Sequence, residues 1–181
     1  QLGAHLVVKP VRQGSALGIT RVSNELELGE AVALAFDYDD QLLIEERIIG
    51  REMTVGVLEH AEHIEAFPVI EIVTPENSWY DFHHRYTQGA SDHIMPAVIN
   101  PALTAQLQAA AIAAHQCLGC RDLSRADFIV MDETNFVLLE VNTLPGMTPT
   151  SLYPDGARGQ GHAFDELLVH LIERAHARGA R

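Results

Sequence analysis

The chain has 181 residues, a length that suits one domain with enough apolar side chains to bury a core. Its 25 acidic and 12 basic side chains give a formal net charge of −13, which argues against a general nucleic-acid-binding or anionic-membrane-binding surface. No apolar run approaches the roughly 18–20 residues that span a bilayer, and we expect neither a membrane span nor a signal peptide.

The first part of the chain is β-rich with one early helix. Apolar patterning and turn residues predict, in order, a strand over 5–9, a glycine-containing loop over 12–18, a strand over 19–22, a helix over 26–36 and a strand over 42–46. Two β-rich runs, 52–58 and 63–73, follow Gly50 and are expected to be antiparallel neighbours.

The second part begins with a long aperiodic segment, 74–96, whose aromatic residues favour an active-site lid or Ω-type loop over disorder. It continues with a helix over 101–118, a hairpin of strands 125–131 and 136–142, a loop over 143–161 and a helix over 164–178. This order predicts an α+β fold rather than a regular βαβ alternation.

The hairpin carries acids within otherwise apolar strands that read as a buried sheet. If the ends of its polar turn, 132–135, pair with each other, Asp127 lies opposite Glu140 and Arg125 lies opposite Asn142. Side chains alternate along a strand, so these four share one face. Directly opposed like charges destabilise a sheet, and burying them unpaired adds to that cost.

A bound cation would remove this objection. Two carboxylates and an amide oxygen are ligands that Mg²⁺ accepts, so the hairpin predicts a metal site formed by Asp127, Glu140 and Asn142. The alternative is that Arg125 alone neutralises Asp127 while Glu140 reaches solvent.

Other segments suggest a phosphate and nucleotide site, each with a simpler alternative. Lys9 ends a buried strand before a loop of small residues, which suits an anion, although a strand-end lysine can also just reach solvent. Glu45 and Glu46 could contact an adenine edge and ribose hydroxyls, or be a solvated acidic pair. The loop over 143–151 could direct backbone N–H groups at a developing oxyanion. Despite the net charge, a local basic pocket could form from Lys9, Arg12, Arg47, Arg51, Arg85 and Arg125.

Cysteines and histidines supply no motif of their own. Cys117 and Cys120 lack the second pair that a zinc site needs, and we interpret them as reduced structural thiols rather than a redox pair. This interpretation fits a cytoplasmic protein. The ten histidines show no metal-ligand spacing and are interpreted as surface or loop residues.

Taken in order, these segments resemble the C-terminal portion of the D-alanine–D-alanine ligases of the ATP-grasp superfamily. The resemblance spans essentially all 181 residues. It implies a partial ATP-grasp fold, a mainly antiparallel sheet flanked by helices, with about 1–46 in the smaller nucleotide-binding lobe and about 47–181 in the larger lobe. The matching stretches are Val8-Lys9-Pro10, Gly14-Ser15-Ala16-Leu17-Gly18, Leu43-Ile44-Glu45-Glu46, Gly50-Arg51-Glu52-Met53-Thr54-Val55, Tyr80-Asp81-Phe82 through Arg85-Tyr86, Leu118-Gly119-Cys120, Arg125-Ala126-Asp127 and Leu139-Glu140-Val141-Asn142-Thr143-Leu144-Pro145-Gly146-Met147-Thr148.

The resemblance also implies a role for particular residues. Those implied to lie at ATP are Lys9, Ser15, Glu45, Glu46, Ile48, Glu52 and Arg85, with Lys9 at the phosphates and Glu52 at the ribose. Those implied to hold two Mg²⁺, which Mn²⁺ could replace, are Asp127, Glu140 and Asn142.

The remaining implied residues face the amino acid substrates. Arg125 and the Gly146 amide would stabilise the tetrahedral intermediate. Ser151 with Leu152 would meet the carboxylate of the second D-alanine. Tyr86 would lie in the Ω loop over the active site, where its identity is linked to the choice of an amine nucleophile.

The chain departs from the family pattern at three places. Arg85 stands where the family usually has lysine, which keeps the charge but changes its geometry. Ala16 replaces the second serine of the glycine loop. The N-terminal substrate domain and the first part of the ATP-grasp region have no counterpart, so the chain, which starts at Gln1 without Met, looks cut from something longer.

We therefore expect the ATP- and Mg²⁺-binding portion of an enzyme that joins two D-alanines through an acyl phosphate for peptidoglycan precursor synthesis. The chain alone is expected to be nearly inactive, to need the N-terminal part as partner, and to follow the family in forming homodimers. Three alternatives stay open: a ligase with another acceptor such as D-lactate, a nucleotide- and Mg²⁺-binding module without catalysis, and a structural domain whose acids are only solvated.

Overall fold

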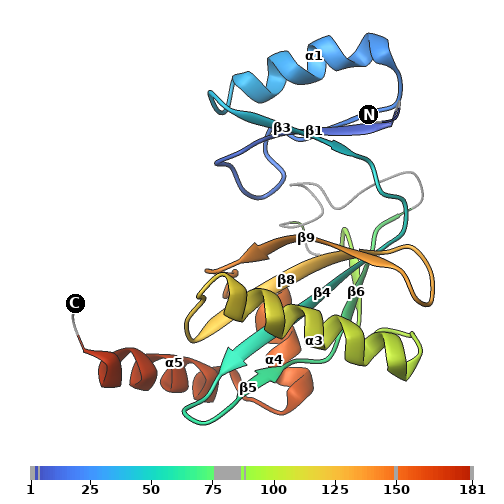
Figure 1. The fold of residues 1–181 in the computed structure, drawn as a ribbon. Coiled ribbons are helices and arrows are strands. Elements are labelled where there is room, and N and C mark those ends of the chain that lie inside the picture. The colour runs from blue at the N-terminus through green and yellow to red at the C-terminus, as the bar shows by residue number, and fades with distance from the viewer. Residues whose placement is uncertain (1–2, 4, 76–86, 88, 149–150, 180–181) are drawn as a thin grey trace. The chain divides into compact units, whose positions relative to one another are not determined.

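The computed structural model describes residues 3, 5–75, 87, 89–148 and 151–179 (Figure 1). Every pairing between strands in this part of the chain is antiparallel, which confirms the expected α+β fold with a mainly antiparallel sheet flanked by helices. The elements are β1 (Leu6–Pro10), β2 (Thr20–Val22), α1 (Glu25–Phe36), β3 (Leu42–Glu46), β4 (Arg51–Glu59), β5 (Ile64–Ala66), β6 (Ile70–Val73), β7 (Asp92–Ile94), α3 (Pro101–Cys117), β8 (Leu123–Val130), β9 (Phe136–Asn142), α4 (Leu152–Gln160) and α5 (Phe164–Arg178).

The described residues divide into two compact units. Unit 1 comprises those within Gln1–Ile49 and Thr74–Ser91, and unit 2 comprises those within Gly50–Val73 and Asp92–Arg181. Each unit has a sheet and at least one helix of its own.

Unit 1 is a three-stranded sheet in the order β2-β1-β3, covered by α1. Its core joins alternate residues of the strands to one stripe of the helix, and consists of Leu6, Val8, Val22, Ala31 and Ala35. The helix begins after Asn24, whose side chain accepts a hydrogen bond from the Leu26 N–H at 3.0 Å. This cap satisfies a backbone donor that the first helical turn leaves unpaired.

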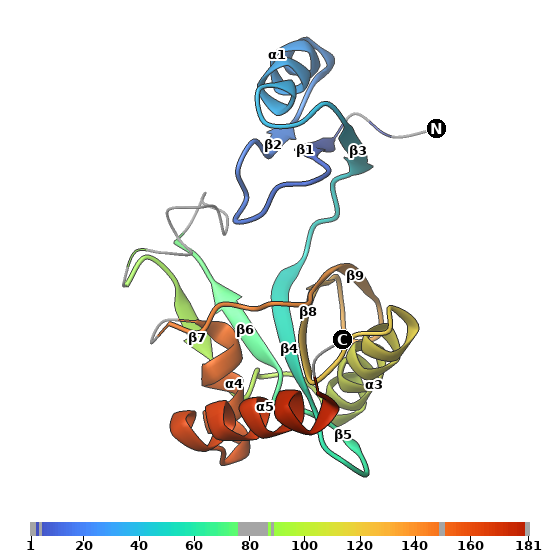
Figure 2. The ribbon, with the colours of Figure 1, turned by 90° about the vertical axis from the view of Figure 1, so that its left-hand side faces the viewer.

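Unit 2 has strands in the order β7-β6-β4-β8-β9, with β5 also paired to β4. Helices cover both faces, α3 on one and α4 on the other (Figure 2). The two-residue alternation of strands separates two cores. Met53, Val55 and Val57 of β4 pack in the core beneath α3, whereas Leu58 packs with Tyr153 and Ala157 of α4 in the other.

Three elements differ from the sequence expectation. The run 63–73 is two strands, separated at Phe67-Pro68-Val69. Strand β7 lies within the segment expected to lack secondary structure, and helix α4 lies within the expected loop 143–161. The short strands gain ladder partners, and α4 gains burial from its neighbours, so tertiary contacts decide all three.

Helix length and the two cysteines agree with the sequence expectations. Among the described residues, no helix has both the length and the apolar character needed to cross a bilayer. Cys117 is the last residue of α3 and Cys120 follows the helix, and both are free thiols, as expected.

Candidate functional site

The hairpin of β8 and β9 pairs Asp127 with Glu140 and Arg125 with Asn142, which confirms the predicted pairing. Because Thr54 of β4 pairs with Asp127 on its other side, the acid lies in the middle of three adjacent strands. The side chains of Arg125 and Asp127 alternate with buried residues that pack under α3, so they lie on the opposite face of the sheet from that helix.

The pairing is reached through a β-bulge that the sequence does not predict. Phe128 pairs with Leu138 and Asp127 pairs with Glu140, so Leu139 has no partner opposite it. The turn begins at Met131, one residue earlier than predicted, and the Met131 N–H donates to the Asn135 carbonyl at 2.9 Å. The extra residue in β9 compensates for this shift in register. A bulge next to a cluster of polar groups re-aims side chains, and here it places Glu140 opposite Asp127.

The expectation of a buried hairpin is correct for only one of its strands. Strand β8 is almost wholly buried, but β9 is the edge strand and exposes 36% of Leu138 and 44% of Leu139. Glu140 is also exposed. Because Glu140 stays in contact with water, the repulsion between it and Asp127 is weakened.

The half-buried Asp127 has three side-chain partners. Arg125 donates from Nε and Nη2 to the two oxygens of Asp127 at 2.8 and 2.7 Å, a bidentate ion pair. Thr54 Oγ1 donates to Asp127 Oδ1 at 2.6 Å. Asn142 Nδ2 contacts Asp127 Oδ2 at 3.0 Å and Glu140 Oε1 at 3.4 Å, so the amide bridges both carboxylates.

This arrangement contains features of both sequence interpretations. The Arg125–Asp127 pair and the exposed Glu140 match the alternative without a cation. The amide that bridges two carboxylates matches the donor set of an oxygen-ligand site. The donor set fits Mg²⁺ chemically, with one rearrangement: the Asn142 amide would turn about its last torsion to present oxygen rather than nitrogen.

In unit 1, Lys9 Nζ lies 2.6 Å from Glu45 Oε2. Val7 of β1 pairs with Glu45 of β3, so the two charged side chains are diagonal neighbours on one face of the sheet. Glu46 is exposed and Ile48 is half-buried. Lys9 therefore neither reaches solvent alone nor stands as an unpaired cation for phosphate.

The loop between β1 and β2 closes on a turn with two residues in the left-handed region. Ser15 and Ala16 have φ of 56° and 61°, and the Leu17 N–H donates to the Gly14 carbonyl at 3.1 Å. This is the backbone of a type I′ turn, which Asn and Gly favour because L side chains are strained there. The loop thus holds Ser15 in a defined backbone conformation.

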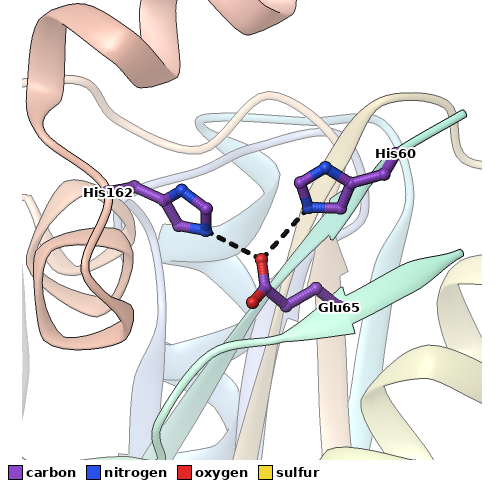
Figure 3. Close-up of side chains that lie close together, drawn as sticks. All are labelled: His60, Glu65 and His162. Carbon is purple, nitrogen blue, oxygen red and sulfur yellow. Dashed lines mark hydrogen bonds and ion pairs between the residues drawn. The ribbon is translucent and has the colours of Figure 1, made fainter.

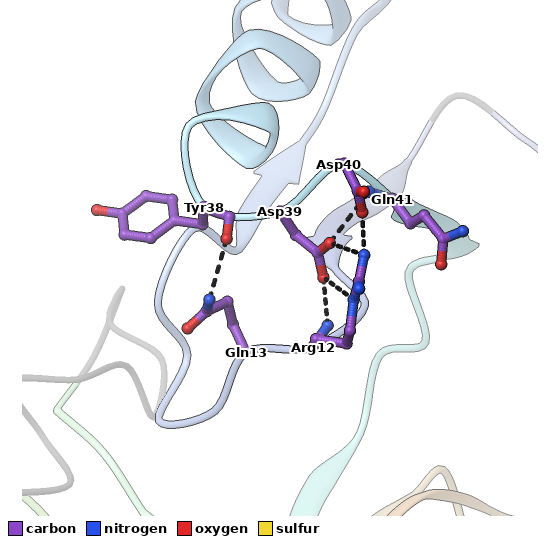
Figure 4. Close-up of polar contacts among 6 residues, drawn as sticks. All are labelled: Arg12, Gln13, Tyr38, Asp39, Asp40 and Gln41. Carbon is purple, nitrogen blue, oxygen red and sulfur yellow. Dashed lines mark hydrogen bonds and ion pairs between the residues drawn. The ribbon is translucent and has the colours of Figure 1, made fainter.

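The start of the same loop is fixed to the connection between α1 and β3 (Figure 4). The Arg12 backbone N–H and Nη2 donate to the Asp39 carboxylate at 2.6 and 2.7 Å, and Arg12 also pairs with Asp40. Gln13 Nε2 donates to the Tyr38 carbonyl at 3.0 Å. Removal from water raises the pKa of Asp39, but the hydrogen bonds from Arg12 outweigh it, and the net shift is far downward.

The predicted substrate loop after β9 has internal contacts. Ser151 Oγ accepts from the Thr148 N–H at 3.0 Å and lies 2.8 Å from Thr148 Oγ1. A Cβ on Gly146 would lie 2.8 Å from Ser151 Oγ, so any larger residue at 146 would require the Ser151 side chain to shift. Leu152 begins α4 and is buried, with 4% of its surface exposed.

The remaining predicted residues divide by position. Arg85 and Tyr86 lie outside the described residues. Glu52 lies in β4 of unit 2, next along the strand from Arg51, which pairs with Glu71 at 2.5 Å. The cations expected to form a basic pocket therefore include four with acidic partners: Lys9, Arg12, Arg51 and Arg125.

Sequence reasoning missed Thr54 as a site residue. It is 1% exposed, and its hydroxyl contacts both the Ala126 carbonyl at 3.1 Å and the Asp127 carboxylate. Its signal in the sequence is a hydroxyl inside the apolar run of β4. The interpretation of the histidines is wrong for His115, which is 1% exposed within α3.

Comparison with known proteins finds the same family over nearly the whole chain. A family model described as the D-ala D-ala ligase C-terminus matches residues 1–173. The chain is 50% identical to the D-alanine–D-alanine ligase of Halalkalibacterium halodurans over 168 residues, which are 92% of this chain and 55% of the relative. It is 43% identical to that of Pelotomaculum thermopropionicum over 175 residues, 97% of this chain and 54% of the relative.

Solved structures agree. The VanG D-Ala:D-Ser ligase from Enterococcus faecalis matches with a TM-score of 0.83 and 36% identity, covering 96% of this chain and 50% of that one. The D-alanyl-alanine synthetase A from Vibrio cholerae matches with a TM-score of 0.82 and 30% identity, covering 94% and 52%. The chain spans about half the length of the curated relatives it matches.

Proposed function

Because the chain belongs to the family of D-alanine–D-alanine ligase C-terminal domains, we propose that it provides the ATP- and Mg²⁺-binding part of an enzyme that ligates two D-alanines. The reaction phosphorylates the carboxylate of one D-alanine and then joins it to the amine of the second. The product is a dipeptide for peptidoglycan precursors. The enzyme is proposed to act in the cytoplasm.

One observation carries the proposal beyond family membership. The pairing of β8 with β9 brings Asp127, Glu140 and Asn142 together on one sheet face, although a 15-residue separation divides the first from the last. This is the donor set that oxygen-binding divalent cations require. We propose that these three residues hold two Mg²⁺, with Mn²⁺ as a substitute.

Bound Mg²⁺ would neutralise phosphate charge and so lower the barrier to phosphoryl transfer. The protein residues would then bind and orient ATP. Lys9 would exchange Glu45 for a phosphate oxygen, which frees that carboxylate to take part in binding the nucleoside. Ser15, Glu46, Ile48, Glu52 and Arg85 are proposed to complete the ATP site.

A second group of residues would act on the amino acids. Arg125 already directs two N–H groups at a carboxylate, and when a cation takes over Asp127 the guanidinium could stabilise the developing oxyanion. The Gly146 N–H is the proposed second oxyanion donor. Ser151 and Leu152 are proposed to meet the carboxylate of the second D-alanine, with Tyr86 over the site.

The proposal is tested by measuring ATP affinity by calorimetry across a range of Mg²⁺ concentrations. Glu140→Gln is the primary variant because Glu140 is exposed, so the substitution leaves the core unchanged. We expect the Mg²⁺ concentration for half-maximal ATP affinity to rise by about tenfold or more, in line with the cost of disturbing a metal shell. Glu133→Gln is the matched control, since Glu133 is an exposed acid in the turn of the same hairpin.

The expected control result is a Mg²⁺ dependence equal to that of the wild type. ATP affinity that ignores Mg²⁺ in the wild type, or an identical Mg²⁺ dependence in Glu140→Gln, would remove the hairpin from the proposed site. Asp127→Asn should give a larger loss than Glu140→Gln, because it also removes the charge and one of the two acceptor oxygens of the Arg125 ion pair.

Ligase activity is measured as ADP release that depends on D-alanine. The curated relatives contain about as much additional chain again, and we propose that catalysis needs an N-terminal part of this kind. The 181 residues alone should then show little or no turnover, and adding that part should restore it. Near-normal turnover by these residues alone would refute this requirement. D-Serine is included as acceptor because one similar structure is a D-Ala:D-Ser ligase.

A further inference from the structure

Two histidines and a glutamate from distant parts of unit 2 converge on one point (Figure 3). His60 follows β4, Glu65 lies in β5, and His162 lies between α4 and α5. Glu65 Oε2 lies 3.1 Å from His60 Nε2 and 2.8 Å from His162 Nε2. The three potential ligand atoms lie within 4.8 Å of one another.

The surroundings orient this group. Gln160 Nε2 donates to the other oxygen, Glu65 Oε1, at 2.8 Å, so both carboxylate oxygens have fixed directions. His63 stacks on His60 with ring centroids 4.4 Å apart, and the His170 ring lies 4.8 Å from the same imidazole. A second set of hydrogen bonds and contacts that fixes the ligands is characteristic of metal sites.

The separations of the two histidine nitrogens from Glu65 Oε2 are close to those in a tetrahedral metal shell. Zn²⁺ binds imidazole nitrogen and carboxylate oxygen at about 2.0–2.2 Å, which places neighbouring ligand atoms about 3.3 Å apart. The observed separations of 3.1 and 2.8 Å need to lengthen by only a few tenths of an ångström. To bind the ion through Nε2, each neutral imidazole would release its Nε2 proton to solvent and take up one proton at Nδ1, so that the ring stays neutral.

The charge state favours a cation. Burial raises the pKa of Glu65, but hydrogen bonds from His162, His60 and Gln160 outweigh it, so the net pKa is lowered and the carboxylate is ionised at neutral pH. A neutral imidazole pair with one carboxylate is a borderline N₂O donor set, which suits Zn²⁺ and related transition metals better than Mg²⁺.

We propose that His60, Glu65 and His162 form a site for a divalent transition-metal ion of the Zn²⁺ class, with water at the fourth position. The ion would tie the β4–β5 hairpin to the segment between α4 and α5, and so stabilise the packing of α5. This proposal does not depend on the ligase function. His60 is six residues beyond Thr54 along the chain, or about 20 Å at the rise of a strand, so the site is far from the hairpin acids.

The test is a calorimetric titration with Zn²⁺ alone, without nucleotide or Mg²⁺. The purified protein carries Cys117→Ser and Cys120→Ser, because free thiols also bind zinc. The ligand variants are His162→Gln and Glu65→Gln, which keep side-chain size and hydrogen-bonding capacity. The control is His176→Gln, an exposed histidine in the last turn of α5.

We expect one Zn²⁺ per chain in the background and control proteins, and a Kd raised at least about tenfold in both ligand variants. Zn²⁺ should also raise the Tm of the background and control proteins, and leave the Tm of the ligand variants unchanged. Co²⁺ should give the intense visible absorption of a tetrahedral site in the background and control proteins, but not in the ligand variants. Because apo Tm values show whether each variant folds, lost binding in a folded variant supports the site.

Two results would overturn the proposal. One is a background protein that binds no stoichiometric Zn²⁺. The other is a ligand variant that binds Zn²⁺ as tightly as the control, since the ion would then be held by other side chains.

Discussion

Thr54 Oγ1 lies 2.6 Å from Asp127 Oδ1, across the pairing of β4 with β8. The same hydroxyl is 3.1 Å from the Ala126 carbonyl. A hydroxyl has one proton, so it donates to one of these acceptors at a time, and the charged carboxylate is the stronger one. Thr54 on β4 therefore helps to fix the rotamer of Asp127, a predicted metal ligand on β8. Arg125 does the same from β8 itself.

Thr54→Val should lower the free energy of unfolding by about 1–3 kcal/mol, because Asp127 loses a buried donor while the side-chain volume stays the same. If Asp127 holds Mg²⁺, the variant should also need more Mg²⁺ for ATP binding. Urea unfolding and the Mg²⁺ titration measure the two effects. Thr54→Ser is the control, since it keeps the hydroxyl and should stay close to the wild type in the Mg²⁺ titration.

Two glycines should respond in opposite directions to alanine. A Cβ on Gly56 would lie 2.5 Å from the Phe67 ring and 3.1 Å from Tyr153, so Gly56→Ala should destabilise unit 2 by about 1–3 kcal/mol through overpacking. Gly29 lies within α1 with open space around it, and Gly29→Ala should stabilise unit 1 by about 0.5–1 kcal/mol. Amide exchange in β4 and in α1 reports each unit separately. Slower exchange in β4 of Gly56→Ala would contradict the steric argument.

Sequence alternation predicted the pairing of Asp127 with Glu140 correctly, but not the path of the chain between them. The opposition of Asp127 and Glu140 follows from counting outward from the turn. The actual chain begins its turn one residue earlier, at Met131, and recovers the same opposition through the bulge at Leu139. Alternation fixes which face a side chain takes, but a bulge depends on twist and packing that a single strand does not encode.

Non-local packing explains what the sequence did not reveal. Helix α4 contains Pro154 and Gly156, which lower helix propensity, yet both are buried and Gly156 allows Phe67 to approach. The convergence of His60 and His162 on Glu65 joins residues about 100 positions apart, so no local spacing marks it. The adenosine and lid residues remain predictions, since they await a bound nucleotide.

Asp122 should control how firmly α5 is attached to the sheet. Its carboxylate accepts from Arg174 Nε at 3.0 Å and from Arg178 at 2.8 Å, and Arg174 also pairs with Glu59. Asp122→Asn should lower stability by about 1.5–3 kcal/mol at neutral pH, the range for hydrogen bonds to charged groups. The control is Glu173→Gln, an exposed acid on the same helix.

The same aspartate should contribute to acid sensitivity. Burial raises the pKa of Asp122, but hydrogen bonds from Arg174 and Arg178 outweigh it, and the folded-state pKa lies below the ordinary 3.8. A depressed acid pKa stabilises the fold above the unfolded value, and this stability is lost as the pH falls below about 3.8 toward the folded value. Protection of α5 amides should therefore fall in that window in the wild type and change little there in Asp122→Asn. If α5 protection fell over the same pH range in Asp122→Asn as in the wild type, the loss would come from other carboxyl groups.

His115 predicts a loss of stability in weak acid. It is 1% exposed, its Nδ1 lies 2.8 Å from Ser124 Oγ, and its Nε2 has no hydrogen-bond partner in the described part of the chain. Burial lowers the pKa of His115 below 6.5, against smaller opposing effects of Glu59 and Asp122. As the pH falls, the unfolded chain therefore binds a proton at His115 at a higher pH than the folded chain does. Stability should fall as the pH drops below 6.5, by at most about 1.4 kcal/mol per pH unit for one proton, until the folded pKa is reached.

His115→Asn isolates this proton, because its amide can replace Nδ1 as the partner of Ser124 but does not titrate. The variant should be less stable at pH values above 6.5, where it has lost packing, and should show a flatter decline below it. Urea unfolding followed by circular dichroism on both sides of that pH gives the two slopes. His176→Asn, on the exposed end of α5, should keep the wild-type slope. Parallel profiles for the wild type and His115→Asn would mean that the decline comes from other groups.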